Sequence, residues 1–169
     1  MLKKIERAQQ LLKKEAAVFR CPTCHEPMHV EGVGLICQQR HQFDLSKKGT
    51  LYFLNHGVQT EYNKKMFTSR GKMIQSGMYA PVLNKIMHYL PQNKTVVDVG
   101  CGEGSFLAEL SQAGLSGLKI GFDLSKEGIY LASNQPIDAF WCVADLTNLP
   151  FANEGLDTIL NIFSPSHYQ

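Results

Sequence analysis

The stretch VVDVGCGEGSF, residues 96–106, decides the fold class of this chain. An apolar, β-branched run ends at Asp98, and Gly100, Gly102 and Gly104 follow at alternate positions. Glycine at every second position weakens both helices and strands, so these residues favour a tight turn. The run before Asp98 is typical of a buried strand, and the residues after Gly104 have helical spacing. A strand, a glycine turn and a helix in this order are typical of nucleotide sites in open α/β sheets.

The rest of the C-terminal half continues this alternation of strand and helix. Apolar and β-branched runs predict strands near residues 95–99, 118–123, 139–144 and 156–162. Amphipathic spacing predicts helices near residues 104–113 and 125–133. Such alternation implies parallel βαβ units, and therefore an α/β fold with a Rossmann-like sheet of about four strands.

Two further predicted strands end in aspartates. Asp123 closes the second strand, nineteen residues after Gly104, and Asp145 closes the third, followed by Leu146. The carboxyl ends of parallel strands meet at the edge where open α/β sheets bind ligands. A carboxylate at Asp123 suits the hydroxyls of a ribose, and one at Asp145 suits the exocyclic amine of an adenine, with Leu146 covering the ring. The alternative is that these aspartates only cap helices and turns.

A cysteine and histidine cluster lies nearer the N-terminus. Cys21 and Cys24 form a Cys-x-x-Cys pair, and Cys37 and His41 follow twelve residues later as a Cys-x-x-x-His pair. Two such pairs supply the four sulfur and nitrogen ligands that tetrahedral zinc prefers. Because protein ligands fill all four positions, the pattern predicts a structural Zn2+ site rather than a catalytic one.

The cysteine spacing leaves alternatives open. A redox-active Cys-x-x-Cys would follow a strand and open a long helix, whereas Pro27 and the β-rich flank favour zinc. Unrelated buried cysteines are another alternative. His25 and His29 are competing ligands, although the paired spacing favours His41. Metal binding would supply the folding free energy that so short a segment lacks.

The composition describes a globular protein of 169 residues, with 44% hydrophobic and 19% charged residues. Lysines and arginines gather in the N-terminal half, which hints at nucleic acid, although solvated helix faces are the simpler explanation on charge alone. Five cysteines with one Cys-x-x-Cys pair indicate a reduced, cytoplasmic protein. No apolar run approaches the ~20 residues of a membrane span, and the lysine-rich N-terminus lacks a signal-peptide core.

Four segments are expected along the chain. Residues 1–20 form an N-terminal helical extension, and residues 21–54 form a zinc-binding module of short strands. Residues 55–91 form a helical connector, and residues 92–169 form a nucleotide-binding domain. In the connector, Met66, Ile74 and Met78 are spaced to form one buried helical face, and Pro81 starts a second helix.

Several segments carry a resemblance to a known family. DVGCGEG, GFDLSK and VADLTNLPFANEGLDTILNIFSP resemble the successive motifs of class I S-adenosylmethionine-dependent methyltransferases. The zinc module CPTCHEPM…ICQQRHQFDLSKKG and the connector MFTSRGKMIQSGMYAPV narrow the match. Together these segments resemble the bacterial 23S ribosomal RNA guanine-N1 methyltransferases, whose Gram-positive members are associated with macrolide antibiotic resistance. The resemblance covers nearly the whole chain from Cys21 onward.

The resemblance implies a zinc-binding RNA-recognition module joined to a methyltransferase domain that binds S-adenosylmethionine. It places the methyl donor against Gly100, Gly102, Glu103 and Gly104, beside Asp98, with the ribose on Asp123 and the adenine near Asp145 and Leu146. Tyr79 matches an aromatic residue of the donor pocket, and a core role for it is equally open. Asn161 is a candidate either for contact with the target base or for a buried cap. The implied partner is a hairpin of 23S ribosomal RNA, and no catalytic residue is identified.

The chain departs from the family in one respect. A class I methyltransferase sheet normally has seven strands, and this sequence stops after the fourth predicted one. The sequence is then an N-terminal portion of such an enzyme, or a second copy completes the sheet in a homodimer through the exposed edge of strand 156–162. Two other functions remain open: a non-catalytic zinc RNA-binding scaffold, and a small-molecule methyltransferase, against which the zinc module argues.

Overall fold

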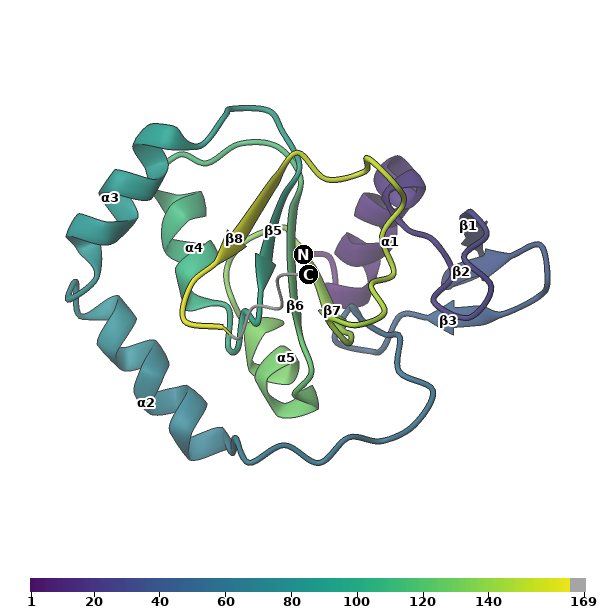
Figure 1. Ribbon diagram of the computed structural model, residues 1–169, viewed down its shortest axis with the longest axis horizontal. Coiled ribbons are helices and arrows are strands. Elements are labelled where there is room, and N and C mark those ends of the chain that lie inside the picture. The colour runs from purple at the N-terminus through teal and green to yellow at the C-terminus, as the bar shows by residue number, and fades with distance from the viewer. Residues whose placement is uncertain (165–169) are drawn as a thin grey trace.

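The computed structural model describes residues 1–164 and contains two β-sheets, with helices packed around the larger one (Figure 1). Residues 165–169 lie outside this range, so Pro165, at the end of the predicted NIFSP stretch, is not described. Among the described residues, no helix has the length and apolar character that crossing a membrane would require.

The smaller sheet is the β-rich part of the predicted zinc module. Its three antiparallel strands, in sequence order, are β1 (Met28–Glu31), β2 (Gly34–Cys37) and β3 (Gln42–Asp44). The central strand β2 is buried along its whole length. This sheet has no separate core, because its buried residues Met28 and Leu35 belong to the same hydrophobic cluster as Phe140 of the larger sheet.

The larger sheet is parallel and has the order β4-β7-β6-β5-β8. The four strands predicted in the C-terminal half are present as β5 (Val96–Val99), β6 (Lys119–Asp123), β7 (Phe140–Val143) and β8 (Thr158–Asn161). A fifth strand, β4 (Thr50–Tyr52), lies in the segment expected to form short strands of the zinc module, but it pairs with β7 and forms the edge of the larger sheet opposite β8. The last part of the segment predicted as the zinc module therefore joins the larger sheet.

Helices cover both faces of the larger sheet (Figure 1). On one face lie α1 (Lys4–Glu15) and a 3₁₀ turn at Ala16–Val18, which bury Leu12 and Val18 in one core cluster. On the other face lie α2 (Lys64–Gln75), α3 (Ala80–Tyr89), α4 (Ser105–Gln112) and α5 (Lys126–Ala132). Helices were expected at each of these places, with boundaries that differ by one or a few residues.

Alternation along β5 decides which side chains reach each helical layer. Val97 and Val99 belong to the cluster that contains α1, whereas Val96 belongs to the cluster that contains α3, α4 and α5. Successive side chains of a strand point to opposite faces, so Asp98 shares the face of Val96. The acidic residue of the glycine motif therefore points toward the layer of α2 to α5.

The buried face of α2 differs from the prediction. Ile74 is buried as expected, but Met66 and Met78 are 37% and 62% exposed. The helix instead buries Phe67, Gly71 and Ile74. Gly71 allows a close approach to the glycine loop, because a Cβ atom there would lie 3.3 Å from Cγ of Glu103.

Candidate functional site

The four predicted metal ligands come together in the zinc module. The ligand atoms of Cys21, Cys24, Cys37 and His41 all lie within 4.8 Å of one another. Cys21 and Cys24 belong to the turn before β1, in which the amide of His25 donates to the carbonyl of Cys21. The second pair consists of the last residue of β2 and the residue just before β3, and the Cys37 amide donates to the His41 carbonyl at 3.1 Å. Two backbone turns thus face their side chains toward one point.

The distances within this group fit zinc. Sγ of Cys24 lies 3.6 Å from Sγ of Cys37, and Nδ1 of His41 lies 3.5 Å from Sγ of Cys21 and 3.4 Å from Sγ of Cys37. A tetrahedral zinc ion with its usual bond lengths separates two sulfur ligands by about 3.8 Å, and a sulfur from a nitrogen by about 3.6 Å. Neither His25 nor His29 belongs to the group. The four side chains therefore form a closed, structural type of zinc site.

The glycine loop follows β5 and leads into α4. Gly102 and Gly104 have positive φ angles of 56° and 81°, which side chains rarely adopt. A Cβ atom at Gly104 would lie 2.6 Å from Cη2 of Trp141, so this glycine lets the loop pack on β7. A Cβ atom at Gly102 would lie 2.1 Å from Nη1 of Arg70, so that glycine leaves room for a side chain from α2.

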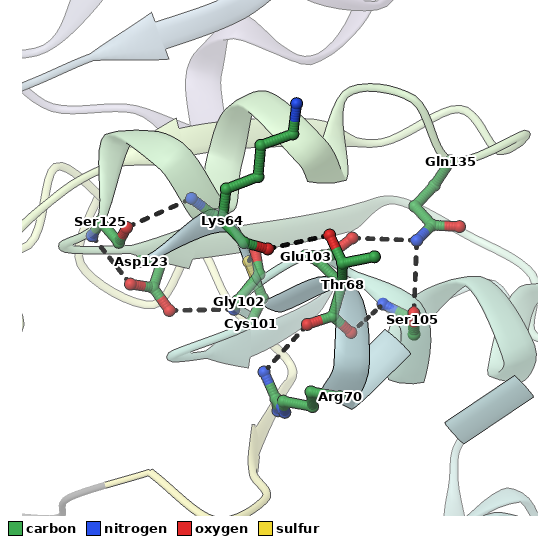
Figure 2. Close-up of polar contacts among 11 residues, drawn as sticks. Lys64, Thr68, Arg70, Cys101, Gly102, Glu103, Ser105, Asp123, Ser125 and Gln135 are labelled. Carbon is green, nitrogen blue, oxygen red and sulfur yellow. Dashed lines mark hydrogen bonds and ion pairs between the residues drawn. The ribbon is translucent and has the colours of Figure 1, made fainter. Parts of the chain in front are cut away.

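Asp123 at the end of β6 holds this loop in place. Its Oδ2 accepts a hydrogen bond from the Gly102 amide at 2.9 Å, and its Oδ1 accepts one from the Ser125 amide at 2.8 Å (Figure 2). Each carboxylate oxygen keeps a further lone pair. Asp145 is arranged similarly, because its Oδ1 accepts hydrogen bonds from the amide and the hydroxyl of Thr147, both at 2.8 Å.

Asp98 lies beneath the loop and is 2% exposed. Burial raises the pKa of the Asp98 carboxyl to about 7; the Arg70 guanidinium opposes this rise, and the carboxylates of Asp123 and Glu103 add to it. The Oδ2 atom of Asp98 has no hydrogen-bond partner among the described residues. Near neutral pH this carboxyl group is therefore partly protonated.

Sequence reasoning missed Arg70, the cation of this site. From α2, its Nη1 lies 3.4 Å from Oε2 of Glu103 (Figure 2). Its guanidinium also stands 5.5 Å from the centre of the Phe106 ring. Glu103 is 5% exposed, and its backbone carbonyl accepts a hydrogen bond from Nε2 of Gln135 at 2.9 Å. Arg70 and Glu103 are 33 positions apart, so no local spacing signals the pair.

A pocket of about 350 Å³ opens beside these residues at the carboxyl edge of the sheet. The residues that line it include the predicted Gly100, Asp123, Asp145 and Leu146, together with Phe67 and Arg70 from α2. Arg70 is the only cationic residue in the lining, within the part of the chain that the structure describes. The pocket thus combines two carboxylates, one guanidinium and apolar walls, which suits a small ligand with several polar groups.

Other predicted residues lie around the pocket rather than in its lining. Asp98, Gly102, Glu103 and Gly104 are all outside the lining; Asp98 and Glu103 are buried, and Glu103 pairs with Arg70, which does line the pocket. Tyr79 precedes α3 and lines a neighbouring apolar cavity, where its ring packs against Phe106 at 5.4 Å. Contact between Tyr79 and a donor therefore stays a prediction. Asn161 is exposed at the end of β8, which does not fit a buried cap.

Two family models match separate segments of the chain. A zinc-ribbon family model described as "RlmA, N-terminal" matches residues 19–55, and one described as "Methyltransferase domain" matches residues 96–169. A crystal structure from Methanococcus maripaludis, provisionally assigned as an S-adenosyl-L-methionine-dependent methyltransferase, superposes with a TM-score of 0.54 at 18% identity, over 64% of this chain and 54% of that one. At that identity the likeness concerns the fold.

Relatives that match along the chain carry names of one kind. Bacillus subtilis (strain 168) YxjB, provisionally named a 23S rRNA (guanine-N(1)-)-methyltransferase, is 40% identical over 90% of this chain. The 23S rRNA (guanine(748)-N(1))-methyltransferase of Streptomyces fradiae is 26% identical over 90% of this chain. The chain spans 58% of the length of each of these relatives. The chain thus resembles an RlmA-type zinc ribbon over residues 19–55 and a methyltransferase domain over residues 96–169, in the same order along the sequence.

Proposed function

We propose that this chain carries the methyl-donor site and an RNA-recognition module of an S-adenosylmethionine-dependent methyltransferase that acts on N1 of a guanine in 23S ribosomal RNA. The observation that carries the proposal is the pocket at the carboxyl edge of the sheet, where Asp123, Asp145 and the glycine loop meet. The reaction and the substrate follow the names of the 40% and 26% identical relatives.

The charges around the pocket suit this donor. Asp123, Asp145 and Glu103 outnumber the single cation Arg70, with Asp98 titrating near neutrality below them. S-adenosylmethionine carries a sulfonium, an ammonium and a carboxylate, and therefore one net positive charge. An anionic pocket favours this donor over its neutral product, S-adenosylhomocysteine, because the carboxylates attract the net positive charge of the donor.

The residues divide naturally among the parts of the donor. Asp123 is assigned to the ribose hydroxyls through its remaining lone pairs, and Asp145 to the adenine amine with Leu146 against the ring. Arg70 is assigned to the carboxylate, since a guanidinium binds carboxylates well. Gly100 and Gly102 allow the backbone to approach the donor closely.

Recognition of RNA is assigned first to the zinc ribbon, because a methyltransferase that acts on small molecules has no need of such a module. The expected partner is a hairpin of 23S ribosomal RNA, whose target guanine has to leave its stack to meet the donor. A homodimer through β8, macrolide resistance and a cytoplasmic location stay predictions.

Methyl transfer forms the bond between guanine N1 and the methyl group as the bond between the sulfonium and the methyl group breaks. The electron pair of the broken bond passes to sulfur, and the N1 proton leaves. None of the described residues is assigned to accept that proton.

Methylation of RNA tests the proposal directly. The zinc-loaded chain is incubated with tritiated S-adenosylmethionine and protein-free 23S ribosomal RNA, and the label in RNA is counted. The modified position is then found by reverse transcription, which stops at N1-methylguanine because the Watson–Crick edge is blocked. The proposal predicts label and one stop at a guanine. No label, or label without a stop at guanine, contradicts it. The variant Asp123→Ala is the matched control for donor dependence.

A further inference from the structure

A second basic surface lies away from the zinc ligands and from the donor pocket. A groove of about 350 Å³ runs between β4 and α5, and we call it the β4–α5 groove. It is lined by lysines and tyrosines together with smaller residues; those that the argument uses are Lys47, Lys48, Tyr52, Lys126 and Tyr130. Lys47, Lys48 and Lys126 lie within motifs quoted above, but those motifs assign no role to this set of residues.

The lysines of the groove have no matching carboxylates. Lys47, Lys48 and Lys126 are exposed, and none of them forms an ion pair with another residue of the range 1–164. Lys48 also lies close enough to Lys4 to help burial lower the pKa of Lys4. Asp44 is the only acidic residue in the described lining. A surface that gathers unpaired cations in this way is complementary to phosphate groups.

The tyrosines give the groove a second property. Tyr52 is 37% exposed and Tyr130 is 50% exposed, which is high for large aromatic side chains. The ammonium of Lys126 stands 5.7 Å from the centre of the Tyr52 ring, and that of Lys48 stands 5.2 Å from the centre of the Tyr130 ring. Each ring therefore carries a cation beside it. Exposed rings interleaved with lysines are the features that bind the bases and phosphates of single strands.

The groove also connects the two parts of the proposed enzyme. Its lining includes Asp44, the last residue of β3 in the zinc ribbon. It also includes Lys126, which opens α5 directly after Ser125, the residue whose amide binds Asp123. β4 is the edge of the sheet opposite β8, so the groove lies on the ribbon side of the molecule.

We propose that the β4–α5 groove binds a single-stranded segment of the substrate RNA, with the lysines on phosphates and Tyr52 and Tyr130 stacked on bases. The identity of the RNA rests on the proposed function, but binding in the groove is measurable without methyl transfer. A strand held there runs from the ribbon toward the edge of the sheet where the donor pocket opens. The groove would thereby feed the RNA into the site.

Fluorescence anisotropy of a labelled single-stranded RNA tests this proposal. The probe is a fluorescein-labelled 12-nucleotide RNA of mixed sequence, titrated with the zinc-loaded chain from 0.05 to 0.3 M KCl. The groove variant is the double substitution Lys48→Gln with Lys126→Gln. Its matched control is Lys13→Gln with Lys14→Gln, which removes the same charge from exposed positions near the end of α1. A third variant, Tyr52→Leu with Tyr130→Leu, keeps apolar side chains but removes the rings.

The expected results follow from counterion release. Losing two phosphate contacts should make the slope of log affinity against log salt shallower by about 1.4, and should weaken binding at 0.1 M salt roughly 25-fold. The tyrosine variant should lose about fivefold or more, and more against the single strand than against a 12-base-pair duplex. The lysine control should stay close to the unmodified chain.

Two results would overturn the proposal: a groove variant with the affinity and slope of the control, or no salt-dependent RNA binding by the unmodified chain. Tyrosine variants that bind as well as the unmodified chain would overturn the stacking role. A parallel titration with S-adenosylmethionine separates the two proposals, because groove variants should keep full donor affinity. Failure of donor binding in every variant, with RNA binding intact, would count against the proposed function and not against the groove.

Discussion

Asp98 provides a quantitative test of the electrostatics of the site. The perturbation is Asp98→Asn, which keeps the shape of the side chain and removes its titration. Burial raises the pKa of Asp98 from 3.8 to about 7 in the folded chain. Between these two values the folded state binds a proton that the unfolded state has released. The contribution of Asp98 to stability is therefore largest at low pH, and it falls as pH rises toward 7.

The size of this effect follows from the shift. Each pH unit between the two pKa values lowers the unfolding free energy by about 1.4 kcal/mol. Asp98 alone therefore lowers the unfolding free energy by about 2–3 kcal/mol between pH 5 and pH 8. Every other titrating group is common to both proteins. The difference between the unmodified chain and Asp98→Asn isolates the one carboxyl. The amide side chain of the variant changes the unfolding free energy by the same amount at every pH. That constant amount cancels when the difference between the two proteins at one pH is compared with the difference at another.

Urea unfolding followed by tryptophan fluorescence measures this difference. Trp141 is the only tryptophan; it is 4% exposed on β7 and reports on the larger sheet. The unfolding free energy of the unmodified chain minus that of Asp98→Asn should fall by about 2–3 kcal/mol from pH 5 to pH 8. Glu61→Gln, at an exposed position, is the control. A difference that stays constant across this range would refute the reasoning about Asp98.

Three further predictions concern the donor, the loop and the metal. Asp123→Ala should weaken S-adenosylmethionine binding by about 1–3 kcal/mol in calorimetry, since ribose and loop hydrogen bonds are both lost; unchanged affinity would remove the ribose assignment. Gly104→Ala should cost about 2–4 kcal/mol in urea unfolding, from its φ of 81° and the contact with Trp141. Gly114→Ala, with positive φ but open space, should cost only about 1–2 kcal/mol, and equal costs would argue against the Trp141 contact. Chelation of zinc should raise hydrogen exchange in β1 to β3 and leave β7 protected, whereas unchanged exchange would contradict a structural metal.

The features that sequence predicted well are encoded locally. The four strands from β5 to β8 and the helices between them follow from short-range periodicity, and the glycine loop is contiguous with β5. The zinc ligands were predictable because two tight turns each fix a pair of ligands, and only their approach to each other depends on the fold.

The features that sequence missed depend on contacts between distant segments. The short β character of residues 50–52 was expected, but the place of β4 in the larger sheet depends on pairing with β7 about ninety positions away, Tyr52 opposite Val143. Arg70 became part of the site only because α2 packs over the glycine loop. The wrong helical face of α2 has the same origin. The helical spacing alone predicted that Met66 and Met78 would be buried. The helix instead turns the small Gly71 toward the glycine loop.

The central claim is that the pocket at the carboxyl edge of the sheet binds the methyl donor. Calorimetric titration of the zinc-loaded chain with S-adenosylmethionine tests it most directly, with bound zinc and Trp141 fluorescence confirming a folded sample. The account predicts saturable binding at one site, weakened in Asp123→Ala. No binding to a folded chain that holds one zinc ion would contradict the assignment of the pocket.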